Sequence, residues 1–150
     1  MLRGAIKACP EAFWNDPAFE NPFWRIAFHA LFYVHFYLKP EADFVPWARE
    51  IPNANFMGPS PWLPDGIWNI EGFNTQEELL EYIDMIEAMM PGALAAYPLE
   101  GPSGFDWISF SRLELHIYSI RHAQHHAGQL IERLRANGYG GVDWVGKVKD

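Results

Sequence analysis

The sequence has 150 residues, a length typical of one folded domain. Hydrophobic residues make up 49% of the chain and aromatic residues 16%, which predicts a compact core and excludes a disordered protein. The net charge of −8 is not offset by any basic run, and this argues against a nucleic-acid partner.

The cellular location is predicted from the cysteine content and the hydropathy. Cys9 is the only cysteine, so no intramolecular disulfide can form and a reducing compartment is indicated. The N-terminal residues lack the continuous apolar run of a signal peptide. The most apolar segment, residues 22–38, is short for a membrane span and carries Arg25, His29 and His35. We therefore expect a soluble cytoplasmic protein without a membrane partner.

Two helices are predicted in the first forty residues. Residues 1–9 form a helix that is short for a bundle member and is stopped by Pro10, and a connector follows to residue 20. The second helix starts at Asn21-Pro22, because asparagine can cap a helix and proline suits its first position. This helix ends near Lys39 and is apolar nearly all round, which predicts burial on most sides.

The second helix carries two histidines on different faces. At about 100° per residue, His35 falls roughly 120° away from the face that carries His29. The residues that share the face of His29 are Arg25, Ile26, Phe32, Tyr33 and Phe36. A buried polar side chain is usually hydrogen-bonded in the core, and this is what we expect of His35. For His29 the spacing leaves core packing and metal ligation equally open.

A long connection and a third helix follow. Residues 40–74 contain six prolines and three tryptophans. So long a connection is uncommon unless it is functional or has short structure of its own. We predict a packed flap that either covers a site at the end of the bundle or only caps the core. Thr75 and Glu78 match a capping box and start a helix that Pro91-Gly92 breaks or kinks before a last turn to Tyr97.

After a loop over residues 98–106, the last helix is predicted from Trp107 or Ser109 to Asn137. One side of this helix carries an apolar seam made by Leu113, Ile117, Ile120, Gln124, Ala127, Ile131 and Leu134. A second apolar face lies nearly opposite and includes His122 and His126. We expect this helix to lie between its own bundle and a second subunit, because both faces need cover. Four helices predict a single all-α domain over residues 1–150, a four-helix bundle.

The last helix holds three histidines within five residues, His122, His125 and His126. Residues four apart share one helical face, so His122 and His126 can bind one metal ion, as the paired histidines of metalloprotease helices do. Ala123 occupies the position where those enzymes have the glutamate that acts as general base. The pattern therefore indicates a metal site without peptidase activity. A third ligand is then required. The alternative is that these are ordinary surface or core histidines. We expect His125 to support the ligands or face solvent, and His116 to be a packing residue.

The early segment Phe-Trp-Arg-Ile-Ala-Phe-His-Ala-Leu-Phe-Tyr and the late segment Leu-Glu-Leu-His-Ile-Tyr-Ser-Ile-Arg-His-Ala-Gln-His-His-Ala-Gly-Gln-Leu resemble the DinB-like superfamily. This superfamily includes YfiT-like metal hydrolases and thiol-dependent transferases, and His-x-x-x-His before Ala-Gly-Gln is the most specific match. The resemblance implies an up-down-down-up four-helix bundle that is often a homodimer. It also implies a divalent metal, usually Zn²⁺ or Ni²⁺, held by His29, His122 and His126.

Three neutral imidazoles leave at least one coordination position open, as at a catalytic metal site. A water in that position is acidified and a thiol is deprotonated. We therefore expect a metal-dependent hydrolase or thiol S-transferase that acts on a small molecule. Tyr33, Tyr118 and Gln129 lie near the ligands on their helical faces and are candidate pocket residues. No carboxylate is placed by spacing as a general base, so the catalytic residues stay unassigned.

A second hypothesis is a non-catalytic, metal-stabilised dimer that binds a ligand or a partner in a stress response. A diiron carboxylate bundle is disfavoured, because the sequence lacks the Glu-x-x-His pairs that this type of site uses. The two main hypotheses share the same three histidines. They differ in whether the open coordination position is used for chemistry.

Overall fold

A computed structural model describes residues 1–62 and 68–146, and this part of the chain is all-helical, as predicted. Its elements are α1 (Leu2–Ala8), α2 (Glu11–Trp14), α3 (Phe23–Phe36), the 3₁₀ helix η1 (Glu41–Asp43), α4 (Gln76–Ala96) and α5 (Arg112–Ala136). The β-structure among the described residues is one isolated bridge between Pro102 and Ser111. None of the described helices is both long and apolar enough to cross a membrane.

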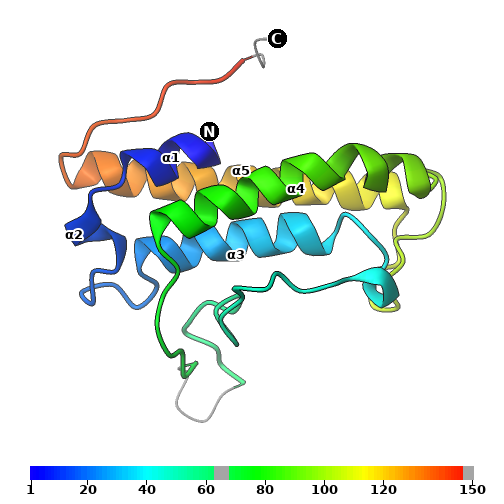
Figure 1. Cartoon of the computed structure of the whole chain (residues 1–150), viewed down its shortest axis with the longest axis horizontal. Coiled ribbons are helices and arrows are strands. Elements are labelled where there is room, and N and C mark those ends of the chain that lie inside the picture. The colour runs from blue at the N-terminus through cyan, green and yellow to red at the C-terminus, as the bar shows by residue number, and fades with distance from the viewer. Residues whose placement is uncertain (63–67, 147–150) are drawn as a thin grey trace.

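The three long helices lie side by side (Figure 1). α3 and α4 run in the same direction, while α1 and α5 run in the opposite direction. α3 packs against both α4 and α5, and the short α1 packs on the same two helices. Because α1 has only 7 residues, it lies along one end of the longer helices and leaves the other end of α5 without this neighbour.

The core forms around α3 because this helix is apolar on almost every side. The side chains of Phe23, Ile26 and Phe28 have no exposed area. They pack in one cluster with Leu79 of α4 and Leu130 of α5. Full burial of each such side chain stabilises the fold by roughly 1.5–3 kcal/mol. The position of α3 between α4 and α5 follows from this burial.

The ends of α3 differ from the prediction. Pro22 and not Asn21 is the N-cap residue. The side chain of Asn21 is used in another contact: its amide donates to the carbonyl oxygen of Gly58 (2.7 Å) and its oxygen accepts from the Gly58 N–H (3.0 Å). The helix ends at Phe36, earlier than the expected end near Lys39. The predicted connector over residues 10–20 also contains α2.

α4 starts as predicted, with the reciprocal capping box of Thr75 and Glu78. Of the two alternatives at Pro91-Gly92, the break does not occur: α4 continues through Pro91 to Ala96 and ends, as expected, next to Tyr97. A proline inside a helix removes one main-chain hydrogen bond. Pro91 and Glu87, whose carbonyl loses this bond, are both exposed, so water can replace the missing donor.

α5 starts at Arg112 and not at Trp107 or Ser109. Ser111 caps it: the Ser111 hydroxyl accepts from the Glu114 N–H (3.3 Å), and the Glu114 carboxylate accepts from the Ser111 N–H (2.8 Å). The predicted seam on this helix is buried only in its C-terminal half. Its N-terminal half is exposed at Leu113, Ile117 and Ile120, where α1 does not reach.

The predicted flap is packed onto the helices. The ring of Trp47 stacks on that of Tyr82 in α4, with centroids 4.3 Å apart and planes 3° apart. Further along, Phe56 stacks on Trp68 at 4.2 Å. Residues 63–67 of the flap and residues 147–150 of the tail lie outside the described residues.

Candidate metal centre

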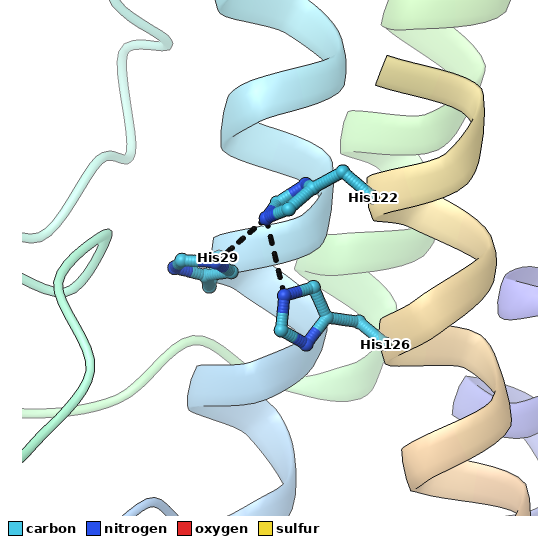
Figure 2. Close-up of side chains that lie close together, drawn as sticks. All are labelled: His29, His122 and His126. Carbon is cyan, nitrogen blue, oxygen red and sulfur yellow. Dashed lines mark hydrogen bonds between the residues drawn. The ribbon is translucent and has the colours of Figure 1, made fainter. Parts of the chain in front are cut away.

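His29 of α3 and His122 and His126 of α5 point toward one another (Figure 2). The Nε2 atom of His122 lies 3.0 Å from Nε2 of His29 and 3.1 Å from Nε2 of His126. In the part of the chain that the structure describes, these three form the one group of His, Cys, Asp or Glu side chains that could hold a metal ion. The structure therefore brings together the three histidines that the sequence singled out.

Two of the three rings have their second nitrogen occupied by an acceptor. Nδ1 of His29 lies 2.6 Å from the carbonyl oxygen of Asn55. A carbonyl oxygen can only accept, so this Nδ1 carries the hydrogen and Nε2 of the neutral ring presents a lone pair to the centre. Nδ1 of His126 lies 3.0 Å from Oε1 of Gln129, which has the same consequence. Metal-ligating histidines are held in this way by a hydrogen bond from the other ring nitrogen.

The third ring, His122, shows why the donor set fits an ion. Its Nδ1 is buried and has no hydrogen-bond partner among the described residues. Only Nε2 of His122 can carry a proton between the rings, and a single N–H cannot fully satisfy the lone pairs of both His29 and His126. A divalent ion satisfies all three. The Nε2 separations are close to the roughly 3.3 Å expected between two imidazole nitrogens on tetrahedral zinc.

The three imidazoles are held in the neutral form that metal binding requires. Burial lowers the pKa of His29 to about 3 and that of His122 to about 4. Burial also lowers the pKa of His126. Repulsion from neighbouring imidazoles lowers each pKa further: His126 and His122 act on His29, His126 and His125 act on His122, and the adjacent His125 acts on His126. No proton has to be displaced from these rings at neutral pH.

Aromatic side chains flank the cluster. The Tyr33 ring meets His29 and His122 edge-on, with centroids 4.9 and 5.3 Å away. The Tyr118 ring lies parallel to His122 at 6.3 Å. Beside Tyr118 is a hollow of about 220 Å³, lined also by Tyr37, Trp107, Ile108, Ser109 and Phe110. The three pocket residues expected from the sequence, including Gln129, are thus all next to the histidines.

The flap reaches the cluster in addition to packing on the core, so both of the contacts considered for it occur. The carbonyl oxygen of Asn55 contacts His29, and the next carbonyl, of Phe56, accepts from Nε (2.9 Å) and Nη2 (2.5 Å) of Arg25. Arg25 lies one turn before His29 on α3. Two side chains of α3 therefore hold the flap against the site. Asn55 was not found from the sequence, because every residue has a carbonyl and the chain carries no signal for this one.

The other histidines have separate surroundings. His35 is buried and its Nδ1 lies 2.9 Å from the Tyr82 hydroxyl, so the prediction of a hydrogen-bonded core residue is confirmed. His125 is exposed, with its ring 4.9 Å from that of His126. His116 lines an apolar groove between α3, α4 and α5. Its Nε2 is buried and has no partner among the described residues.

No protein-family model matches the chain, and no curated protein or solved structure matches it either. The functional assignment therefore rests on the geometry of the three histidines and on the residues around them.

Proposed function

We propose that the protein is a DinB-like, divalent-metal-binding enzyme in which His29, His122 and His126 hold Zn²⁺ or Ni²⁺. The convergence of the three Nε2 atoms carries this proposal. The directions of the helices support the DinB-like four-helix arrangement: α1 and α5 run one way, and α3 and α4, between them in the chain, run the other way. This is an up-down-down-up order.

Zn²⁺ or Ni²⁺, when bound, supplies Lewis-acid activation and lowers the pKa of water or thiol in the open position. The chain's own residues supply orientation and shape. Asn55 and Gln129 accept from the outer ring nitrogens and fix the ring orientations. Tyr33 and Tyr118 form an aromatic wall beside the cluster. The flap is held beside His29 by the Asn55 carbonyl and by the bonds of the Phe56 carbonyl to Arg25.

The charge of the site favours an anionic reacting group. The cluster consists of histidines alone, so three neutral ligands leave the charge of a divalent ion uncompensated. The guanidinium of Arg25 adds positive charge close enough to His29 to lower its pKa further. A thiolate or another anionic atom of a substrate would therefore bind favourably.

A hollow of about 220 Å³ lies beside Tyr118, and none of the three histidines is among its lining residues. Its volume is just below the usual range of ligand pockets, roughly 300–1,000 Å³, so only a small molecule, or one end of a thiol cosubstrate, fits it. Thiol S-transfer and hydrolysis both meet these requirements, so the reaction class is open between the two.

The first test is the metal content of the protein, purified without a histidine tag and measured by elemental mass spectrometry. We expect about one ion per chain in the wild type, as for a mononuclear site, and loss of the ion in His29→Ala and in His126→Ala. His125→Ala is the matched control, because this exposed neighbour lies outside the cluster and should keep the ion. Wild-type protein that stays empty after dialysis against Zn²⁺ and Ni²⁺ would overturn the proposal.

The metal found then determines the assay. The loaded protein is tested with thiol-conjugation substrates and with panels of esters and amides. Turnover that is lost in His126→Ala and kept in His125→Ala would establish the enzyme and its reaction class. If metal is bound but no substrate is turned over, the non-catalytic hypothesis gains support. It predicts that His122→Ala lowers the melting temperature while no substrate protects the site.

A further inference from the structure

The hollow beside Tyr118 is walled mainly by aromatic rings. It lies between the end of α3, the first half of α5 and the loop before α5, and its lining residues are Tyr37, Trp107, Ile108, Ser109, Phe110 and Tyr118. We call it the aromatic hollow. Trp107 and Tyr118 are 62% and 42% exposed. Exposed aromatic side chains that gather around a concave surface are typical of a binding site.

The walls of the aromatic hollow are held in place by contacts among the protein's own residues. Nε1 of Trp107 donates to the carboxylate of Glu41 in η1 (3.2 Å). The ring of Tyr118 contacts those of Phe110 and Tyr37, with centroids 6.1 and 5.9 Å away. Since the site is already formed, a ligand does not have to order these rings when it binds, and less entropy is lost.

The aromatic hollow also contains a buried hydroxyl. Tyr37 is only 4% exposed, and its hydroxyl makes no hydrogen bond with another described residue. Burial raises the pKa of Tyr37, and the nearby phenols of Tyr118 and Tyr33 raise this pKa further. The hydroxyl of Tyr37 is therefore protonated at neutral pH and lies close to that of Tyr118. A buried hydroxyl without a partner is unfavourable, and it can donate to a ligand or accept from it.

The aromatic hollow lies about one helical turn from the metal centre. Tyr118 precedes His122 by four residues on α5, a rise of about 6 Å, and the planes of the two rings are 13° apart. The ring of Tyr33 lies 5.6 Å from that of Tyr37 and 5.3 Å from that of His122. A molecule whose ring occupies the hollow can therefore reach the metal centre with a short arm.

We propose that the aromatic hollow is the subsite for a phenol-type ring of the substrate, with Trp107 and Tyr37 as the residues that determine this specificity. The inference rests on the proposed function, because the metal centre supplies the reaction. The ring packs on Trp107 and Tyr118, since aromatic pairs favour offset-stacked or edge-to-face contacts. The oxygen on the ring gives the Tyr37 hydroxyl its missing partner.

The first test compares three small probes of similar size by NMR titration of the full chain. Para-cresol has both the ring and the hydroxyl, toluene lacks the hydroxyl, and para-methylcyclohexanol lacks the aromatic ring. We expect para-cresol to bind about three- to tenfold more tightly than either of the others, the effect of one hydrogen bond or one aromatic contact. Equal affinities for the three probes, or no binding of para-cresol up to its solubility limit, overturn the proposal.

Two variants test the residues of the subsite. Tyr37→Phe removes only the hydroxyl, so the affinity for para-cresol is expected to fall to that for toluene, while the affinity for toluene stays unchanged. Trp107→Leu is expected to remove the preference for para-cresol over para-methylcyclohexanol. Trp144→Leu is the matched control, because Trp144 is 74% exposed and does not line the hollow. Circular dichroism checks the folding of each variant. Wild-type probe affinities in both Tyr37→Phe and Trp107→Leu overturn the proposal.

The link to the metal centre is tested on protein loaded with Ni²⁺, through the absorption of a bound thiolate. A thiol with a phenol ring on a two-carbon arm is expected to bind about tenfold more tightly than ethanethiol, because burial of the ring adds to the bond with the metal. This advantage should be lost in Trp107→Leu and kept in Trp144→Leu. An advantage that persists in Trp107→Leu overturns the subsite. If the protein binds no metal, the proposed function fails, whereas the probe titrations, which need no metal, still decide whether the hollow holds the ring.

Discussion

The Nδ1 atom of His29 lies 2.6 Å from the main-chain carbonyl oxygen of Asn55, 26 residues further along the chain. The carbonyl oxygen can only accept a hydrogen bond, so this contact sets the tautomer of His29 and directs the Nε2 lone pair toward His122 and His126. The flap thereby fixes which nitrogen of His29, one of the proposed ligands, is free to bind a metal ion. The same kind of control operates on His126 through Gln129.

Gln129→Ala is expected to weaken metal binding by about ten- to a hundredfold, the usual effect of removing a group that orients a ligating histidine. Gln129→Glu keeps an acceptor for Nδ1 of His126 and should retain most of the affinity. The measurement is competition with a chromophoric chelator. Gln124→Ala, on the same helix but away from the histidines, is the control. Equal affinities of Gln129→Ala and wild type would show that the bond to His126 does not support the site.

Arg25→Met is expected to lower the unfolding free energy by about 1–3 kcal/mol, because the Phe56 carbonyl then loses both of its hydrogen bonds to the guanidinium. Metal binding should also weaken, since the loosened flap carries the carbonyl that orients His29. Urea denaturation and chelator competition measure the two effects. Arg25→Lys, which can still donate to the carbonyl, should lose less of both. If Arg25→Met matches wild type in both measurements, Arg25 does not hold the flap.

Between pH 7 and about pH 5, metal affinity is expected to fall less than it would with three ligands of ordinary pKa, because burial lowers the pKa of all three histidines. The pKa of His29 is lowered to about 3 and that of His122 to about 4, chiefly by burial, so protons compete for these rings only at lower pH. A ligand with the ordinary pKa of about 6.5 would cost about thirtyfold in affinity at pH 5. Calorimetric titrations at several pH values measure the dependence. A steep loss of affinity that begins near pH 6.5 would contradict the lowered pKa values.

His35 is expected to make the stability of the protein depend on pH. Burial lowers its pKa from 6.5 to about 4, and the charge of Lys39 acts in the same direction. The unfolded chain therefore binds a proton between pH 6.5 and 4 that the folded chain does not bind. The stabilisation is complete above pH 6.5 and is lost as the pH falls, by up to about 1.4 kcal/mol per unit.

This pH dependence is tested with His35→Gln, which does not titrate and can still bond to the Tyr82 hydroxyl. Urea unfolding of metal-loaded protein between about pH 6.5 and pH 5 should show a smaller slope in the variant than in wild type. The three clustered histidines contribute the same slope to both proteins, so the difference between the two slopes reports on His35. Parallel curves for the two proteins would contradict the assignment.

Local features of the helices were predicted correctly where a single short sequence motif determines the structure. The Thr75–Glu78 capping box marks the start of α4, and the four-residue spacing of His122 and His126 places both rings on one face of α5. The same kind of motif, Ser111 with Glu114, starts α5. The predicted start of α5, at Trp107 or Ser109, is too early because the apolar residues before Ser111 continue the helical pattern. Such features depend on side chains within one or two turns and need no tertiary contact.

Other features depend on which segments meet. His29 and His122 are 93 residues apart, and only the packing of α3 on α5 brings their Nε2 atoms to 3.0 Å. The Asn55 carbonyl has no sequence signature. The sequence determined that Leu113, Ile117 and Ile120 share one helical face, because the helical repeat is a local property. Whether that face is buried was decided by the fold, because burial requires a neighbouring helix and α1 reaches only the other end of α5.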